Sequence, residues 1–223
     1  MPEMLPVGSL RLDGALLTAI LSVAAGLCAL RVWFWRIALE SELRLFWMAA
    51  LTNMCLISLI GWKLAFLIDD PSLLWNRPSS LILLRGSASD AAALLLAAVI
   101  YLLILIRRRR IPMVQLLDIL PYAVLPGCFV WELLWQTPYL LPYASLVIVI
   151  YIVLIRTPEA AVPGSGKSSQ LCALGLGYGG LLVSLFTVYP PSAVPLLILG
   201  LTRLQWIFIA LAGLGALLQA RNG

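Results

Sequence analysis

Hydrophobic residues in this chain gather in long runs, and short polar segments separate the runs. Each run approaches the length of about 20 residues that an α-helix needs to cross the hydrocarbon core of a bilayer. We interpret each run as one transmembrane helix. The seven runs lie near residues 15–34, 45–68, 90–106, 114–135, 139–155, 170–189 and 204–218. The pattern therefore predicts an all-α polytopic membrane protein, a single domain built as a seven-transmembrane-helix bundle.

The composition supports this fold class. Of the 223 residues, 62% are hydrophobic and 11% are charged, and the mean hydropathy is +1.02. Soluble domains average about 25% charged residues, so a soluble fold is excluded. The formal net charge is +5. Because the basic residues stand at the ends of the apolar runs, they indicate membrane topology, and we expect no nucleic-acid partner.

The basic residues also predict an orientation. The first, third, fifth and seventh runs each end in arginine, at Arg31 and Arg36, Arg107–Arg110, Arg156 and Arg221. Under the positive-inside rule these ends are cytoplasmic. The N-terminus is then outside and the C-terminus inside. Residues 69–85 form an outer loop, in which the apolar segment 80–84 is too short to span and is expected at the interface or as a re-entrant segment.

The segment Pro163–Ser169 reads PGSGKSS, which invites comparison with a phosphate-binding loop. That pattern needs a glycine where Ala161 stands, and it follows a β-strand. Here the segment joins the fifth and sixth runs on the cytoplasmic side, with no strand before it. Gly, Pro and Ser are typical of a short flexible turn between helices. We expect a loop and no bound nucleotide.

The inventory of side chains argues against a cofactor or a metal. The chain has no histidine, which removes imidazole catalysis and histidine ligation together. Its four cysteines lie inside apolar runs without the spacing of a metal site, and we expect them to be buried and inert.

Ionisable residues inside the runs are candidates for function, because each costs about 2.5–3.5 kcal/mol on insertion. Lys63 and Glu132 fall at similar depth in the outer half of the bilayer, and we predict that they form an ion pair. Asp90, Asp118 and Arg203 are expected at the interfaces, within reach of water.

Two prolines, Pro121 and Pro126, lie in the fourth run. They predict a broken helix, which would line a cavity or a lipid-headgroup pocket.

Several short motifs, in order, resemble a known family. They are Gly61–Leu67, Arg85–Asp90, Arg107–Pro112, Leu116–Asp118, Pro126-Gly127, Leu176–Gly179 and Leu204–Trp206. Over residues 45–134 and 170–218 the chain resembles bacterial prolipoprotein diacylglyceryl transferase. That family transfers a diacylglyceryl group from phosphatidylglycerol to a lipobox cysteine, and it has seven spans with the N-terminus outside. The resemblance implies a multi-pass protein of the bacterial cytoplasmic (inner) membrane.

The residues that carry chemistry in that family are replaced here. Asp90 stands in place of the histidine of a His-Gly-Gly turn, and Glu132 in place of an arginine at the lipid headgroup. Trp135 replaces an asparagine, and Leu182 and Phe186 replace an arginine and a glutamate. The resemblance thus implies a transferase-like scaffold that has lost its proton-transfer group and its phosphate clamp.

We expect a non-catalytic membrane protein, either an accessory or structural subunit of a larger membrane complex or a lipid-binding protein. Its partners would be other transmembrane subunits and membrane lipids. The alternative is a divergent phosphatidylglycerol-dependent diacylglyceryl transferase acting on lipoproteins, with Asp90, Lys63 or Glu132 in new roles.

Overall fold

A computed structural model of the chain describes residues 4–7, 10–69, 71–72, 75, 86–135, 141–189 and 195–222. Seven helices dominate this part of the chain, and it is a multi-pass membrane protein. Six of them are long and apolar enough to cross a membrane. The six are α1 (Gly14–Arg36), α2 (Ser41–Leu64), α6 (Ala88–Arg108), α7 (Met113–Trp135), α9 (Lys167–Phe186) and α10 (Arg203–Asn222).

The seventh apolar helix, α8 (Leu141–Arg156), has 16 residues. At 1.5 Å per residue it is about 24 Å long, shorter than the hydrocarbon core of about 30 Å. The all-α class and the positions of the seven helices agree with the hydrophobic pattern. The predicted second span is divided, because α2 ends at Leu64 and a short helix, α3 (Phe66–Asp69), follows it.

Two small antiparallel hairpins were not predicted. Strands β1 (Met4–Val7) and β2 (Leu10–Asp13) precede α1, and β3 (Leu197–Ile198) and β4 (Leu201–Thr202) precede α10. Between β3 and β4, Leu199 and Gly200 both have positive φ, at 52° and 81°. A two-residue turn of this kind matches the twist of a hairpin. Each hairpin thus leads the chain into the start of a long helix.

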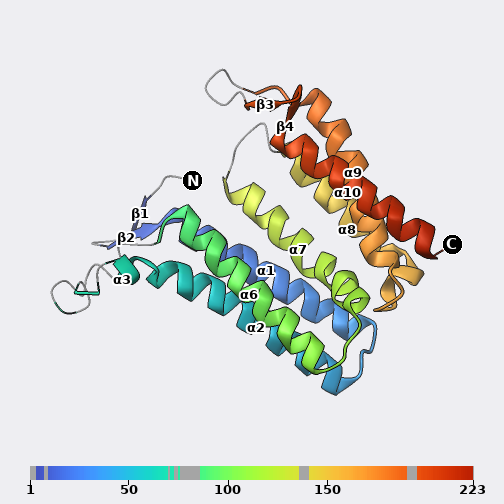
Figure 1. Ribbon diagram of the computed structural model, residues 1–223, viewed down its shortest axis with the longest axis horizontal. Helices are drawn as coiled ribbons and strands as arrows, with labels where there is room; N and C mark the ends of the chain where they lie inside the picture. Colours follow the sequence, from blue (N-terminus) through green and yellow to red (C-terminus); the bar gives the residue numbers. More distant parts are fainter. Residues whose placement is uncertain are drawn as a thin grey trace.

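The helices form two groups with α7 between them (Figure 1). One group contains α1, α2 and α6, and the other contains α8, α9 and α10. The closest packing is between α9 and α10, between α1 and α7 and between α2 and α6, while α7 also contacts α8 and α9. The two groups diverge toward the end at which α7 finishes. The predicted orientation places this end outside, and we call that part of the molecule the outer half.

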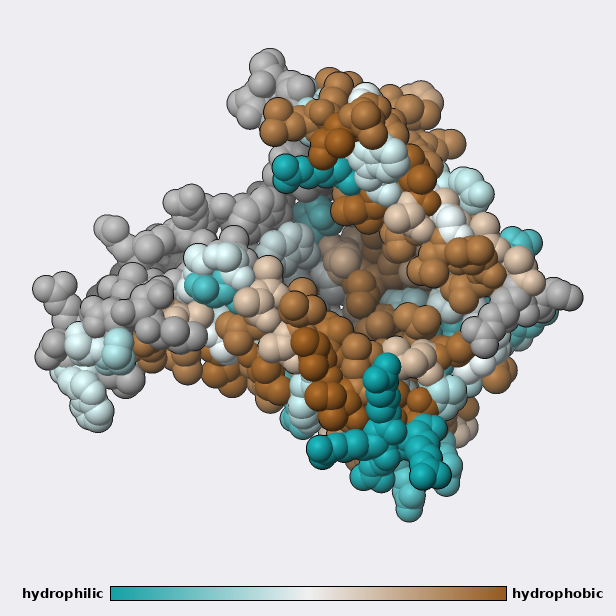
Figure 2. Space-filling model, in the orientation of Figure 1, coloured by the Kyte–Doolittle hydropathy of each residue, from teal (hydrophilic) through white to brown (hydrophobic). Residues whose placement is uncertain are grey.

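The hydrophobic core lies mainly toward the opposite end, which the predicted orientation places on the cytoplasmic side. Trp33 of α1 stacks on Tyr122 of α7, with 3.8 Å between the ring centroids. Around them the most deeply buried apolar side chains are Leu30, Phe34, Trp47, Ile106, Ile119 and Leu154. At the same end, Figure 2 shows a hydrophilic cluster where α6 finishes, and the exposed residues Arg107–Arg110 belong to it. The bundle is therefore most tightly packed near the end at which α7 begins.

Close approach of α1 and α7 depends on small residues. A Cβ on Gly26 would collide with the backbone carbonyl of Ala123, and one on Gly127 would lie 3.0 Å from the carbonyl oxygen of Ser22. Such backbone contact between membrane helices requires residues without bulk. It fixes α1 against α7 and so sets the position of every side chain on α7.

The prediction of a broken fourth helix was wrong. Helix α7 runs without interruption from Met113 to Trp135, with Pro121 and Pro126 inside it. Each proline removes only one N–H from the helical ladder, and a membrane helix tolerates this where neighbouring helices support it. The helix is supported on both sides, by α1 and by α8 and α9.

Candidate functional site

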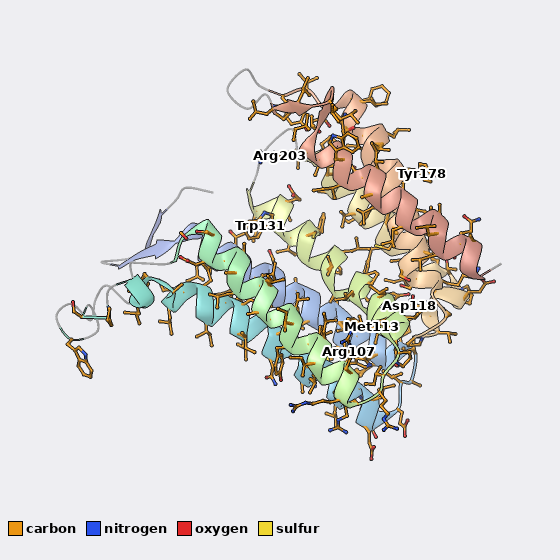
Figure 3. All side chains as sticks on the ribbon, viewed as in Figure 1. Arg107, Met113, Asp118, Trp131, Tyr178 and Arg203 are labelled. Carbon is orange, nitrogen blue, oxygen red and sulfur yellow. The ribbon has the colours of Figure 1, made fainter. Side chains whose placement is uncertain are left out.

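A buried carboxylate lies near the N-terminal end of α7. Asp118 is completely buried, although the sequence suggested an interfacial position with water in reach. Its Oδ2 atom accepts hydrogen bonds from the backbone N–H groups of Gly164 at 2.9 Å and Gly166 at 2.7 Å. Its Oδ1 atom accepts from both the backbone N–H and the hydroxyl of Ser169, each at 3.0 Å. The expectation was wrong because four donors from the chain replace water (Figure 3).

These donors come from the PGSGKSS segment. It follows a 3₁₀ turn (Pro158–Ala161), and α9 begins at Lys167, three residues before the predicted start of the span. No strand precedes it, and residues 163–166 form a turn as predicted, but residues 167–169 are the first turn of α9 and not part of a loop. Gly164 and Gly166 have positive φ, at 96° and 76°, which turns successive N–H groups toward one point. That point holds Asp118. An external phosphate would have to displace this carboxylate from the same donors.

Further polar side chains join the N-terminal half of α7 to the loop. The hydroxyl of Tyr122, one helical turn after Asp118, donates to the carbonyl of Ala160 at 3.0 Å. Ser168 and Gln170 at the start of α9 are also buried. Sequence reasoning missed this cluster. The available signal was the i, i+4 spacing of Asp118 and Tyr122, which places both on one face of a helix.

An apolar groove runs along the other side of α7. One cavity of about 270 Å³ lies between α1, α2 and α7, and a second of about 220 Å³ lies between α7, α9 and α10. Leu120 and Val124 line both. The two cavities therefore share one face of α7, and Figure 2 shows hydrophobic side chains around the hollow between the two groups of helices. We call these cavities and their shared face the α7 groove.

Two polar atoms without partners belong to this part of the molecule. Ser22 is one of the residues that line the first cavity. Its hydroxyl oxygen and the Glu132 Oε2 atom are both buried, and neither has a hydrogen-bond partner. Glu132 follows Cys128, a lining residue, by one helical turn, and its carboxyl interacts electrostatically with the Cys128 thiol. The expectation that the four cysteines are buried was wrong, since Cys28 and Cys128 are exposed and Cys55 and Cys172 are half-buried. Glu132 was a predicted candidate, and Ser22 was not.

The expected ion pair between Lys63 and Glu132 stays a prediction. Lys63 lies in the last turn of α2, and Glu132 lies in the last turn of α7. Both residues are therefore near the outer ends of their helices. However, α2 packs mainly on α6 and less on α1, whereas α7 packs closely on α1. Glu132 Oε2 receives no hydrogen bond.

Asp90 caps a helix. It lies in the first turn of α6, where its Oδ2 atom accepts from the backbone N–H and from the hydroxyl of Ser87, both at 2.7 Å. Its own N–H donates to the Ser87 hydroxyl at 3.3 Å. This reciprocal pair is a capping box, which satisfies backbone groups that the first turn leaves free. A structural need therefore accounts for an acidic residue at this position.

The remaining positions matched to the transferase do not gather around the groove. Leu182 and Phe186 project from α9 with 61% and 79% of their surface exposed. Neither lines the two cavities of the α7 groove. Trp135 ends α7, and its side chain lies outside the described residues. Arg203 is exposed at the start of α10, as expected for an interfacial residue. Arg85 and the segment 80–84 of the predicted outer loop also lie outside the described residues.

Comparison of the chain with models of protein families, with curated proteins and with solved structures finds no match. The resemblance to the transferase therefore remains a hypothesis that rests on the motifs alone. Within the described residues, no three His, Cys, Asp or Glu side chains come together as they would to hold a metal ion.

Proposed function

We propose that this protein is a non-catalytic membrane protein on a prolipoprotein diacylglyceryl transferase-like scaffold, and that it binds other components of the bacterial cytoplasmic membrane. The observation that carries the proposal is the dispersal of its ionisable groups. Asp90 caps α6, and Asp118 anchors the loop before α9. Glu132 stands near the outer end of α7 and lines neither cavity of the α7 groove. General acid–base catalysis needs such groups within hydrogen-bond reach of one reacting centre.

Binding of lipid is the role that the α7 groove supports best. Its lining is apolar, and it lies at the level of the hydrocarbon core between helices that span it. A role as an accessory subunit rests on a different surface. A hollow of about 460 Å³ lies between α8 and α9, beside the exposed Val149 and Tyr178. A helix of a partner chain would pack there through van der Waals contact, the main attraction between helices in lipid.

Purification in a mild detergent, followed by native mass spectrometry, tests the proposal. The expected result is a complex that contains a bound lipid or a second chain at fixed stoichiometry. Val149→Trp, which adds bulk to the α8–α9 surface, should release a partner chain and leave lipid bound. Val32→Trp is a matched control on an exposed position of α1. A bare monomer that never acquires lipid or a partner would contradict the proposal.

The competing function is a divergent diacylglyceryl transferase. Its support is the buried carboxyl oxygen of Glu132 next to the exposed Cys128 at the edge of the groove, since buried intramembrane carboxyls are candidates for general bases. It predicts turnover of phosphatidylglycerol that depends on Glu132.

A further inference from the structure

A cavity between α1 and α2 combines arginine with apolar side chains. It measures about 280 Å³, and its lining residues are Arg31 and Trp35 of α1 and Arg44, Leu45 and Met48 of α2. None of these residues lines either cavity of the α7 groove. We call this cavity the arginine pocket. It is a separate candidate site from the α7 groove.

The arginine pocket lies beside the turn that joins α1 to α2, residues 37–40, at the end of the bundle where α6 finishes (Figure 1). Arg31 and Trp35 are four positions apart, so they share one face of α1. The same spacing places Arg44 and Met48 on one face of α2. The Arg31 guanidinium lies 5.7 Å from the centroid of the Trp35 ring. Helical spacing thus brings one arginine from each helix to the same cavity.

The charge of the pocket calls for an anion. A guanidinium stays protonated in proteins, so Arg31 and Arg44 are both positive and repel each other. No carboxylate is among the described residues that line the pocket. The positive-inside rule accounts for arginines near this end of the helices. It does not require two of them, from different helices, to line one cavity.

Neighbouring groups extend the positive charge beyond the pocket. Arg109 belongs to the exposed arginine cluster at the end of α6, and its guanidinium lies 5.7 Å from the ring centroid of Phe46. Phe46 follows the lining residue Leu45 on α2. A group of like charges at one end of the bundle attracts anions to that surface.

The apolar part of the lining indicates which kind of anion fits. Trp35 and Leu45 are 63% and 68% exposed, and tryptophan is typical of the membrane–water interface. The hydrocarbon stems of the two arginines add further apolar surface. A soluble phosphate would leave this surface unused, whereas a lipid has an apolar chain to cover it.

We propose that the arginine pocket binds an anionic phospholipid. The lipid phosphate accepts hydrogen bonds from Arg31 and Arg44, and an acyl chain packs on Trp35, Leu45 and Met48. The planar guanidinium matches two oxygens of one phosphate. A choline headgroup brings its own cation toward the arginines, so a lipid without that cation is preferred. The inference goes beyond the proposed function, because it concerns a different cavity and a headgroup charge.

Native mass spectrometry of the full-length, delipidated chain tests the assignment. The probes are phosphatidylglycerol and phosphatidylcholine with identical acyl chains, at equal concentration. Phosphatidylglycerol should bind about fivefold more tightly, the contribution expected of one arginine toward an anionic lipid. Arg31→Gln and Arg44→Gln should each remove the preference. The matched control is Arg36→Gln, which removes the same charge from an exposed arginine of α1 outside the pocket and should preserve it.

A second variant fills the pocket without changing its charge. Met48→Trp should weaken the binding of phosphatidylglycerol, and Ala49→Trp, at an exposed position of α2 outside the pocket, should not. Each variant must keep the elution profile and melting temperature of the parent chain. If a glutamine variant unfolds, the lysine variant of the same arginine replaces it. The preference should then fall in part, because lysine keeps the charge but lacks the fork of donors.

The outcomes separate the pocket from its alternatives. Equal losses in Arg31→Gln, Arg44→Gln and Arg36→Gln would show a diffuse attraction to the positive surface and overturn the pocket. Displacement of the lipid by an equal concentration of glycerophosphoglycerol, the headgroup without acyl chains, would identify a soluble phosphate ester as the ligand instead. Equal binding of both lipids by the parent chain would overturn the arginine pocket and leave lipid binding in the α7 groove intact. Absence of any bound lipid would contradict both.

Discussion

Gly166 donates its backbone N–H to the Asp118 carboxylate across 2.7 Å, although 48 positions separate the two residues in the sequence. The bond joins α7 to the start of α9. Three further donors, from Gly164 and Ser169, complete the shell of the carboxylate. The positive end of the α9 dipole lies on the same side and favours an anion there. The loop thus forms an anion site whose anion is part of the protein.

Replacement of Asp118 should be strongly destabilising. Asp118→Ala leaves buried N–H groups without an acceptor, and each such loss costs about 1–3 kcal/mol, so we expect a total of about 3 kcal/mol or more. Asp118→Asn should also destabilise the fold, because the NH₂ group of the new amide would face N–H or O–H donors of the loop instead of an acceptor. Thermal unfolding in detergent measures the effect, with the exposed Glu159→Gln as control. An unchanged melting temperature in Asp118→Ala would show that the loop does not depend on this carboxylate.

The capping box at α6 predicts a smaller and coupled effect. Ser87→Ala should lower stability by about 1 kcal/mol, the usual loss for an N-cap residue. Asp90→Ala should act in the same direction. Since the two side chains bond to each other's backbone, the double variant should lose less than the sum of the single variants. A double-mutant cycle by thermal unfolding measures the coupling. Strict additivity would contradict the reciprocal cap.

Glycine at the contact between α1 and α7 should be irreplaceable. Gly26→Ala places a methyl group against the carbonyl of Ala123, so the helices must separate and the folded yield should fall severalfold. Gly213 on α10 is the matched control, because a Cβ there has no atom within 4 Å. Gly213→Ala should be neutral or stabilise by up to about 1 kcal/mol, the difference in helix propensity. Similar losses for both variants would refute the close contact.

Topology can be tested with reporter fusions. Fusions after Arg110 and at Gly164 should report a cytoplasmic position, and fusions near Asn76 and Pro138 an external one. The prediction follows from the arginines at the ends of α1, α6 and α8. An external signal at Gly164 would reverse the orientation and place the Asp118 cluster on the outside.

The hydrophobic pattern was sufficient to predict the helices, because a long apolar run in a membrane has few alternatives to a helix. The hairpin at Leu199 and Gly200 was not foreseeable, since strands of two residues leave no periodic signal. The prediction of a broken helix at Pro121 and Pro126 was wrong, because packing on both sides of α7 compensates for the lost hydrogen bonds.

Some residues of the candidate sites could be predicted from the sequence, and others could not. Glu132 was identifiable as a carboxyl within an apolar run. The burial of Asp118 was not, because its donors lie 46 to 51 positions away and only tertiary contact brings them together. Ser22 was missed for the same reason. The burial of its hydroxyl, the lack of a hydrogen-bond partner and the neighbouring cavity are visible only in the folded chain.

The central claim is that the chain lacks transferase chemistry, and a direct assay of diacylglyceryl transfer tests it. The purified protein is incubated with phosphatidylglycerol and a lipobox peptide, and the peptide is examined by mass spectrometry. We predict that no diacylglyceryl thioether forms, because the proposed resemblance matches Asp90 and Glu132 to the family's proton-transfer group and phosphate clamp. Formation of the thioether by the parent chain, and its loss in Asp90→Ala or Glu132→Gln, would contradict the claim.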